Sequence, residues 1–165
     1  MKTWLKVLIV TLVVGIPTVP LGQVIWRAPA DAMQPSGGQL PFFIALSVVE
    51  GLLFGLGVAF LVFGYPLVRN IVRGPNGFTW AAYLSVAWLL VSWWPHDNFH
   101  RVTPHEDFGG LLGIEYSFHL TLMAAGAIVA YYFIRSVAAR TITQEVVEPR
   151  TSPATLQADA KLPMA

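Results

Sequence analysis

Apolar residues in this chain are gathered into four long blocks, which cover residues 5–26, 42–68, 78–94 and 111–134. Crossing a hydrocarbon core of about 30 Å takes roughly 20 helical residues, a length that these blocks approach or exceed. None of the blocks alternates with a period of two, and each is longer than a barrel strand of roughly 9–11 residues. The pattern predicts an all-α polytopic membrane protein, with a bundle of four transmembrane helices in residues 1–140.

Positive charges are unevenly divided between the two ends of the predicted helices. One side carries only Arg27 and Arg101. The other side carries Lys2, Lys6, Arg69, Arg73, Arg135, Arg140, Arg150 and Lys161. The positive-inside rule therefore predicts that both termini lie in the cytoplasm and that the loop after the third block is extracytoplasmic. This bias suits a bacterial plasma membrane, and the lipid bilayer is the first partner that the sequence predicts.

The first apolar block has a second interpretation. Lys2 and Lys6, an apolar run over residues 7–16 and small residues near position 30 resemble a cleavable signal peptide. The apolar stretch, however, continues past Pro17 and Pro20 to Trp26, which is long enough to span a membrane. We expect a retained transmembrane helix.

Residues 141–165 differ from the rest of the chain in being polar, without an apolar period. They include Pro149, Pro153 and Pro163. Such a segment cannot bury enough apolar surface to offset the entropy of ordering, so we expect a disordered cytoplasmic tail.

Composition excludes several classes of function. The chain has no cysteine, so disulfides, thiolate-ligated metals and haem attached through cysteine are excluded. A net charge of +1 without a basic stripe gives no argument for nucleic acid. Hydrolase, Walker and Rossmann motifs are absent, and with them the argument for a nucleotide. A bound metal would need nitrogen and oxygen ligands.

All the histidines of the chain lie in the stretch that joins the third block to the fourth. They are His96, His100, His105 and His119, and the acidic residues Asp97, Glu106, Asp107 and Glu115 accompany them. Imidazole and carboxylate groups together are ligands for Zn²⁺, Cu²⁺ and Fe²⁺. The stretch therefore indicates a metal site or a proton-handling site at the outer membrane boundary.

Three ionisable residues stand out within the apolar blocks, where each needs a partner or a function: Glu50, Glu115 and His119. Glu115 and His119 are four residues apart and so share one face of the fourth helix. Glu50 is predicted at the depth of His119, about 12–13 Å below the outer surface, so the second and fourth helices could bring the three together. The alternatives are a protonated Glu50 hydrogen-bonded across a helix pair, and a Glu115–His119 ion pair that only fixes helix register. Gly51 and Gly55 after Glu50 have the GxxxG spacing that lets another helix approach closely.

The segment after the third block presents two further imidazoles. If Pro95 begins a helical turn, His96 and His100 stand on one face, a common way to offer two ligands to zinc or copper. Asp97 could orient one imidazole or cap the turn. The alternative is a pair of solvated interfacial histidines.

Thr103, Pro104 and Glu106 have the spacing of a capping box, which predicts that the fourth helix begins at Pro104. Glu106 and Asp107 would then complement the helix dipole. His105 and His119 would be about 21 Å apart along the axis, so His105 is not expected to be a ligand of the same ion.

The sequence thus predicts a small integral membrane protein with a metal site on the extracytoplasmic side of the bundle, a metalloenzyme or a metal-carrying accessory subunit. The predicted ligands are His96, His100, Glu115 and His119, with Glu50 and Asp97 as further ligands or supporting groups; Zn, Cu and Fe are the candidate metals. One alternative is a non-catalytic subunit of a larger membrane complex, in which polar residues fix helix packing against a protein partner or a second copy. The other is a small transporter or proton relay.

Overall fold

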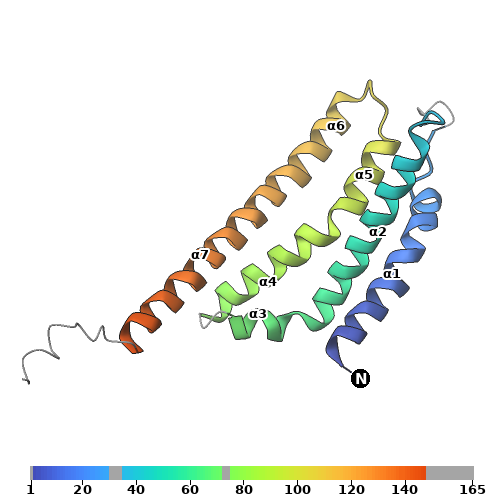
Figure 1. The fold of residues 1–165 in the computed structure, drawn as a ribbon. Helices are drawn as coiled ribbons and strands as arrows, with labels where there is room; N and C mark the ends of the chain where they lie inside the picture. Colours follow the sequence, from blue (N-terminus) through green and yellow to red (C-terminus); the bar gives the residue numbers. More distant parts are fainter. Residues whose placement is uncertain (1, 30–34, 72–74, 148–165) are drawn as a thin grey trace, which may run out of the picture.

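The computed structural model describes residues 2–29, 35–71 and 75–147, with residues 139–147 as backbone. Within these ranges the protein is all-α and has no strand (Figure 1). The helices are α1 (Thr3–Ile25), α2 (Leu40–Phe63), α3 (Tyr65–Ile71), α4 (Asn76–Val91), α5 (Trp93–Val102), α6 (Phe108–Glu115), the π-helix η1 (Tyr116–Leu120) and α7 (Thr121–Val147).

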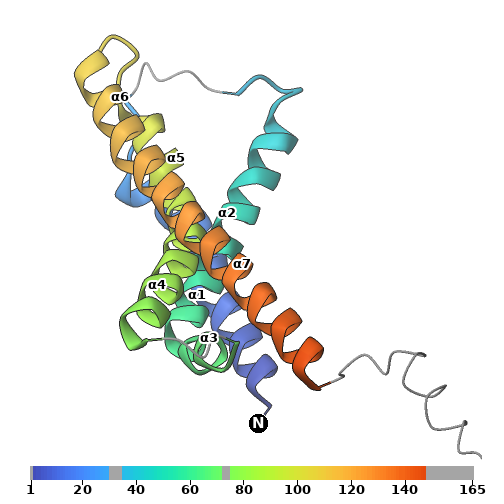
Figure 2. The ribbon, with the colours of Figure 1, turned by 90° about the vertical axis from the view of Figure 1, so that its left-hand side faces the viewer.

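The long helices lie side by side in the order α1, α2, α4, α7. α5 continues the course of α4 after a break at Ser92, and packs against α2 and α6 (Figure 1). α6, η1 and α7 form one long rod, which Figure 2 shows in front of α4 and α5. α5 therefore lies between α2 and the rod at one end of the molecule.

Within the part of the chain that the structure describes, three helices are long and apolar enough to cross a membrane: Thr3–Ile25, Leu40–Phe63 and Phe108–Ala138. They coincide with the first, second and fourth predicted blocks. α4, on the third block, is a shorter apolar helix. The second block is longer than its helix, because α2 ends at Phe63 and α3 begins after Gly64. Many large apolar side chains point outward from the spans, among them Val13, Phe42 and Met123. Such a surface is favourable in lipid and costly in water.

α1 and α2 are in backbone contact through glycines, as the GxxxG spacing predicts. A Cβ on Gly51 would lie 2.8 Å from the carbonyl oxygen of Gly15, and one on Gly55 would lie 2.7 Å from the amide nitrogen of Gly15. The Thr18 hydroxyl donates to the Gly15 carbonyl at 2.5 Å, so the polar group at this contact is paired. Close approach of small residues is how helices associate where lipid removes the hydrophobic driving force.

Arg101 of α5 holds the C-terminal end of α1. Its guanidinium donates to the carbonyl oxygens of Gly22 at 2.6 Å and Trp26 at 2.9 Å. The Gly22 carbonyl also accepts from the Trp26 amide at 3.1 Å, so Arg101 adds a second bond at this helix end. The Trp26 ring packs edge-on against Trp94 at 5.0 Å between centroids. α1 is therefore tied to α5 as well as to α2.

The opposite end of the molecule has its own small core, formed by Val68, Ala82, Tyr83 and Tyr132. The Tyr132 hydroxyl donates to the Val68 carbonyl at 2.7 Å, and that of Tyr83 donates to the Leu61 carbonyl. These bonds pair buried hydroxyls across helices, and they anchor α7 and α4 to the α2–α3 junction.

The predicted start of the fourth helix is wrong. Thr103 is the C-cap of α5, with its hydroxyl donating to the Phe99 carbonyl at 2.9 Å, and the next helix begins at Phe108. Asp107 is the N-cap there, and its carboxylate accepts from the Gly110 amide at 2.9 Å. The physical reason is that α5 is a full helix reaching Val102, so Thr103 belongs to that helix's end and Pro104 terminates it.

α7 extends through Val147, so residues 141–147 of the predicted disordered tail are helical. Residues 148–165, with Arg150 and Lys161 of the charge argument, lie outside the described residues, as does Arg73.

Candidate metal centre

α5 presents two imidazoles on one face, as the four-residue spacing predicts. Nε2 of His100 lies 3.1 Å from Nε2 of His96. His96 is 7% exposed and is enclosed by the rings of Trp93 and Phe118. α5 is longer than the single turn expected after Pro95, and it carries this pair down against the rod.

η1 supplies the other half of the cluster. A π-helix is wider than an α-helix, and short π segments occur frequently at functional sites. Here the wide turn includes His119 and directly follows Glu115. The Thr121 hydroxyl lies 2.6 Å from the Ser117 carbonyl and 3.0 Å from that of Phe118, and it accepts from Trp88 Nε1 at 3.0 Å. These contacts stabilise carbonyls in the wide turn and link it to α4.

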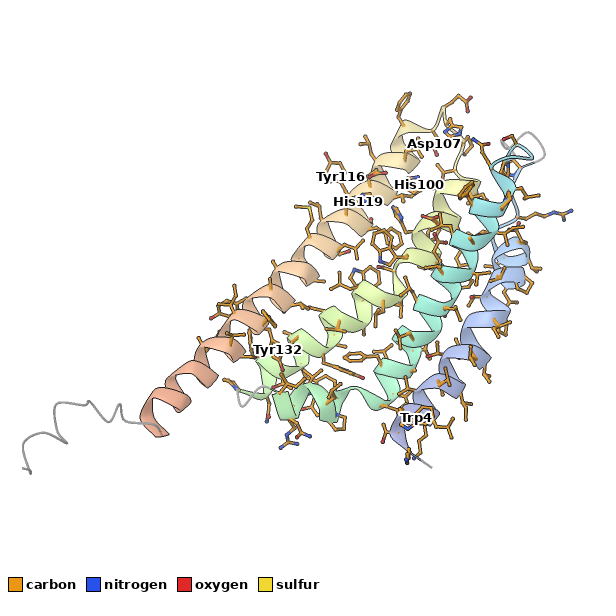
Figure 3. All side chains as sticks on the ribbon, in the orientation of Figure 1. Trp4, His100, Asp107, Tyr116, His119 and Tyr132 are labelled. Carbon is orange, nitrogen blue, oxygen red and sulfur yellow. The ribbon has the colours of Figure 1, made fainter. Side chains whose placement is uncertain are left out.

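The two halves meet at Glu115. Oε1 of Glu115 lies 3.2 Å from Nε2 of His100, and Oε2 lies 2.5 Å from Nδ1 of His119. The rings of His96 and His119 are 5.1 Å apart between centroids. Figure 3 shows His100 and His119 at the same end of the molecule, on neighbouring elements, with Tyr132 far along α7. α5 therefore lies against the segment that carries His119, as the single-site hypothesis requires.

One ligand atom from each of His96, His100 and Glu115 lies within 4.8 Å of the other two. Ligands at about 2.0–2.1 Å around a tetrahedral ion lie roughly 3.3–3.4 Å apart. The two measured distances from His100 Nε2, 3.1 and 3.2 Å, are close to that spacing. A small movement of the side chains would seat an ion.

Proton counting also favours a cation among these groups. A neutral imidazole has one N–H and one lone pair, and a carboxylate has only acceptors. If His100 Nε2 carries its proton, it can donate well to Glu115 or to His96, but not to both. If it is unprotonated, it faces the Glu115 carboxylate lone pair to lone pair. A cation bound by all three groups removes this conflict.

His119 contacts the carboxylate of Glu115 and is not a member of the three-residue group. An Nδ1–H that donates to Oε2 orients the carboxylate and leaves Oε1 directed at His100, as outer hydrogen-bond partners do for metal-binding carboxylates. In this geometry His119 positions a ligand.

The His96 imidazole is poised to stay neutral. Burial, together with the neighbouring His100, lowers the pKa of His96 below its ordinary value. Its Nδ1 is buried without a hydrogen-bond partner, and the nearest charged oxygen is Oδ1 of Asp97 at 3.5 Å. A neutral imidazole keeps a lone pair for a metal. Asp97 thus lies where a supporting group would, at the outer limit of hydrogen-bond distance.

Glu50 does not join Glu115 and His119. It is 8% exposed and lines a cavity of about 80 Å³ together with Asp97, Asn98, Arg101 and other residues of α1, α2 and α5. The prediction placed Glu50 beside Glu115 and His119 on depth alone, but α5 contacts both α2 and α6 and lies between them. Glu50 faces the opposite side of α5 from the histidines.

His105 and Glu106 are exposed in the turn between α5 and α6, outside the cluster, as the sequence argument expects. Sequence reasoning missed the π turn and Thr121, because no local pattern in the chain distinguishes five π-helical residues from a continued α-helix. It also missed Arg101 as the partner of α1.

Comparisons of the chain with protein-family models, curated proteins and solved structures find no match.

Proposed function

We propose that this chain is an integral membrane metalloprotein that binds one divalent transition metal through His96, His100 and Glu115, with His119 orienting Glu115. The observation that carries the proposal is the convergence of two imidazole nitrogens and a carboxylate oxygen from α5 and α6 within 4.8 Å. The segment Phe108–Ala138, which carries Glu115 and His119, is long and apolar enough to cross a membrane.

The ligand set favours a reactive metal over a purely structural one. Structural zinc sites are closed by four protein ligands, whereas catalytic sites keep a position for water or substrate. Two histidines and one carboxylate leave such positions open. This set suits zinc in hydrolytic chemistry and Fe²⁺ in oxygen chemistry. We therefore favour a membrane metalloenzyme over a metal-carrying accessory subunit.

The proposed topology has four crossings, with α4 and the first residues of α5 as the third, both termini in the cytoplasm and the metal site extracytoplasmic. Eight of ten basic side chains support this orientation. α1 is proposed to be retained, because it contacts α2 through Gly15 and Arg101 bonds to its end. A bacterial plasma membrane remains the proposed location.

Elemental analysis of the purified protein tests the metal. The protein is extracted in mild detergent, incubated with Zn²⁺, Fe²⁺ or Cu²⁺ in turn, and desalted. We expect about one equivalent of one metal in the wild type, the occupancy of a single three-ligand site. The variants His96→Ala, His100→Ala and Glu115→Gln should lose it.

Two matched controls separate site ligands from exposed groups of the same kind. His105→Ala and Glu106→Gln change a histidine and a glutamate of the α5–α6 turn, and both should retain the metal. Circular dichroism of each variant checks that the helices are intact. A folded wild type that retains none of the three metals, or folded site variants that retain metal like the controls, would contradict the proposal.

A further inference from the structure

The metal cluster is closed on one side and open on the other. His96 is the buried member, with 7% of its surface exposed. The side chain of His100 is 31% exposed, and those of Glu115 and His119 are each 47% exposed. Exposure therefore rises from α5 toward α6 and η1. A ligand that completes the coordination of a bound ion would approach from that side.

The residues that surround the open side are apolar. On the rod, Leu112 precedes Glu115 by three residues and Met123 follows His119 by four, which is the spacing of neighbours on a helix surface. Leu112 is 53% exposed and Met123 is 70% exposed. Tyr116 and Leu120 are exposed on the same stretch of the rod, and Figure 3 shows Tyr116 on its outer side, directed away from α5 and from the cluster. The cluster is thus a polar window in an otherwise apolar face.

That face belongs to a membrane-crossing helix. Phe108–Ala138 is long and apolar enough to span, and only 11% of its most apolar window is buried within the fold. Glu115 lies seven residues after Phe108, or about 10 Å along the axis, and His119 about 16 Å. The head-group layer on each side of a bilayer is about 5–8 Å thick, so the window opens in the outer part of the acyl-chain region. Polar groups that face acyl chains are costly. Glu115 is paired with His100 and His119, but its side chain and that of His119 are still 47% exposed, so a polar occupant of the window would lower this cost.

We propose that the occupant and substrate is a membrane-dissolved amphiphile, with an oxygen-bearing head group at the metal and an apolar tail along the rod beside Leu112 and Met123. This inference rests on the proposed metal site. An oxygen head group fits the open coordination positions, since carboxylate, hydroxyl and carbonyl oxygens bind these ions. An apolar tail fits the exposed side chains above and below the window. A second copy of the chain would cover the same face, but it would also close the open positions.

The first experiment tests which phase the window faces, and it needs no metal. Because the chain has no cysteine, Leu112→Cys and Met123→Cys each create a single site for a nitroxide label. In liposomes we expect both labels to be relaxed more by oxygen than by a water-soluble nickel chelate. A label at Glu106→Cys, in the exposed turn, is the matched control and should show the reverse. Stronger relaxation by the nickel chelate than by oxygen at the two window labels would show that they face water, which would overturn the proposal. Protection from both reagents, together with dipolar coupling between labels on two copies of the chain, would show that a second copy covers the window, and this would also overturn it.

The second experiment tests the ligand class with Cu²⁺ as the metal and oleate and acetate as probes. Both probes carry the same carboxylate, so a difference between them measures the tail. We expect oleate to change the Cu²⁺ electron paramagnetic resonance spectrum at a concentration at least roughly 100-fold lower than acetate, from the burial of a few methylene groups. Leu112→Ser combined with Met123→Ser should narrow this difference without changing the copper content.

Equal concentrations of oleate and acetate for the same spectral change would overturn the lipid-facing site while leaving the metal site intact. Absence of copper from folded wild-type protein would instead contradict the proposed function itself. The two failures are therefore distinguishable.

Discussion

His119 Nδ1 lies 2.5 Å from Glu115 Oε2 across the first turn of η1. The other oxygen of the same carboxylate lies 3.2 Å from His100 Nε2 on α5. A strong hydrogen bond at one oxygen restricts rotation of the carboxylate, so the π turn and α5 are coupled through a single glutamate. His119, which lies in the π-helical turn, thus orients the carboxylate of Glu115.

Replacement of His119 should weaken metal binding without abolishing it. We expect His119→Ala to lower the affinity for Zn²⁺ by about 10–100-fold, the usual effect of losing an outer hydrogen-bond partner. His119→Asn retains a donor and should recover part of the loss. Isothermal titration calorimetry measures both, with His105→Ala as the unaffected control. A loss as complete as that of His100→Ala would instead make His119 a direct ligand.

Metal affinity should fall as the solution is made acidic. Two imidazole ligands of ordinary pKa would cost roughly 100-fold in affinity between about pH 7.5 and about pH 5.5, because both must release a proton to bind. Burial and the neighbouring His100 lower the pKa of His96, so protons compete less well there. The expected loss is therefore between roughly 10-fold and 100-fold. Competition with a chromophoric chelator at fixed ionic strength measures it, and an affinity independent of pH would argue against histidine ligands.

A methyl group on Gly55 should separate α1 from α2. Its Cβ would lie 2.7 Å from the Gly15 amide nitrogen, so the backbones must move apart. We expect Gly55→Ala to lower the free energy of unfolding by about 1–3 kcal/mol, the usual cost of overpacking. Denaturation in mixed micelles, followed by circular dichroism, measures the change.

Gly126 provides the matched control in α7, since a Cβ there meets nothing within 4 Å. Gly126→Ala should be neutral, or stabilising by up to about 1 kcal/mol from the higher helix propensity of alanine. Equal destabilisation by both substitutions would show that the α1–α2 contact is not special.

The position of the cap before α6 can be tested by two substitutions. Asp107→Ala removes the acceptor of the Gly110 amide and should cost about 0.5–2 kcal/mol in the free energy of unfolding. Thr103→Ala removes only a bond to the last turn of α5 and should cost less. If the capping box predicted from the sequence were correct, Thr103→Ala would cost more than Asp107→Ala. The free energies of unfolding of the two variants therefore decide which residue is the N-cap.

Some features of this fold follow from local patterns. The apolar blocks predict helices because their length and hydrophobicity leave few other ways to pair backbone groups in lipid. The close α1–α2 contact follows from Gly51 and Gly55, because spacing alone places both on one face. The convergence of His96 and His100 follows from their separation by four residues in the same way.

Other features were predicted wrongly or missed because they depend on which elements are neighbours. Thr103 and Asp107 are both good N-cap residues, and the end of α5 decides between them. Glu50 was expected beside His119 from its depth alone, but depth leaves the direction of a side chain open, and α5 lies between, so that Glu50 lines a cavity with Asp97 and Arg101. The tail prediction failed at residues 141–147 because α7 continues the preceding helix past its apolar part.

The sequence by itself determined that this protein is built from apolar helices and that its imidazole groups, with several carboxylates, gather in the stretch that joins two of the apolar blocks. Only the tertiary structure decided that His96 and His100 lie close to Glu115, that His119 contacts the other oxygen of the same carboxylate, and that Glu50 lines a separate cavity. The reason is that helical periodicity relates only residues that lie within one or two turns of each other on the same helix. The meeting of α5 with α6 depends on packing between segments that are joined by a turn and held by α2, α4 and the π-helical turn.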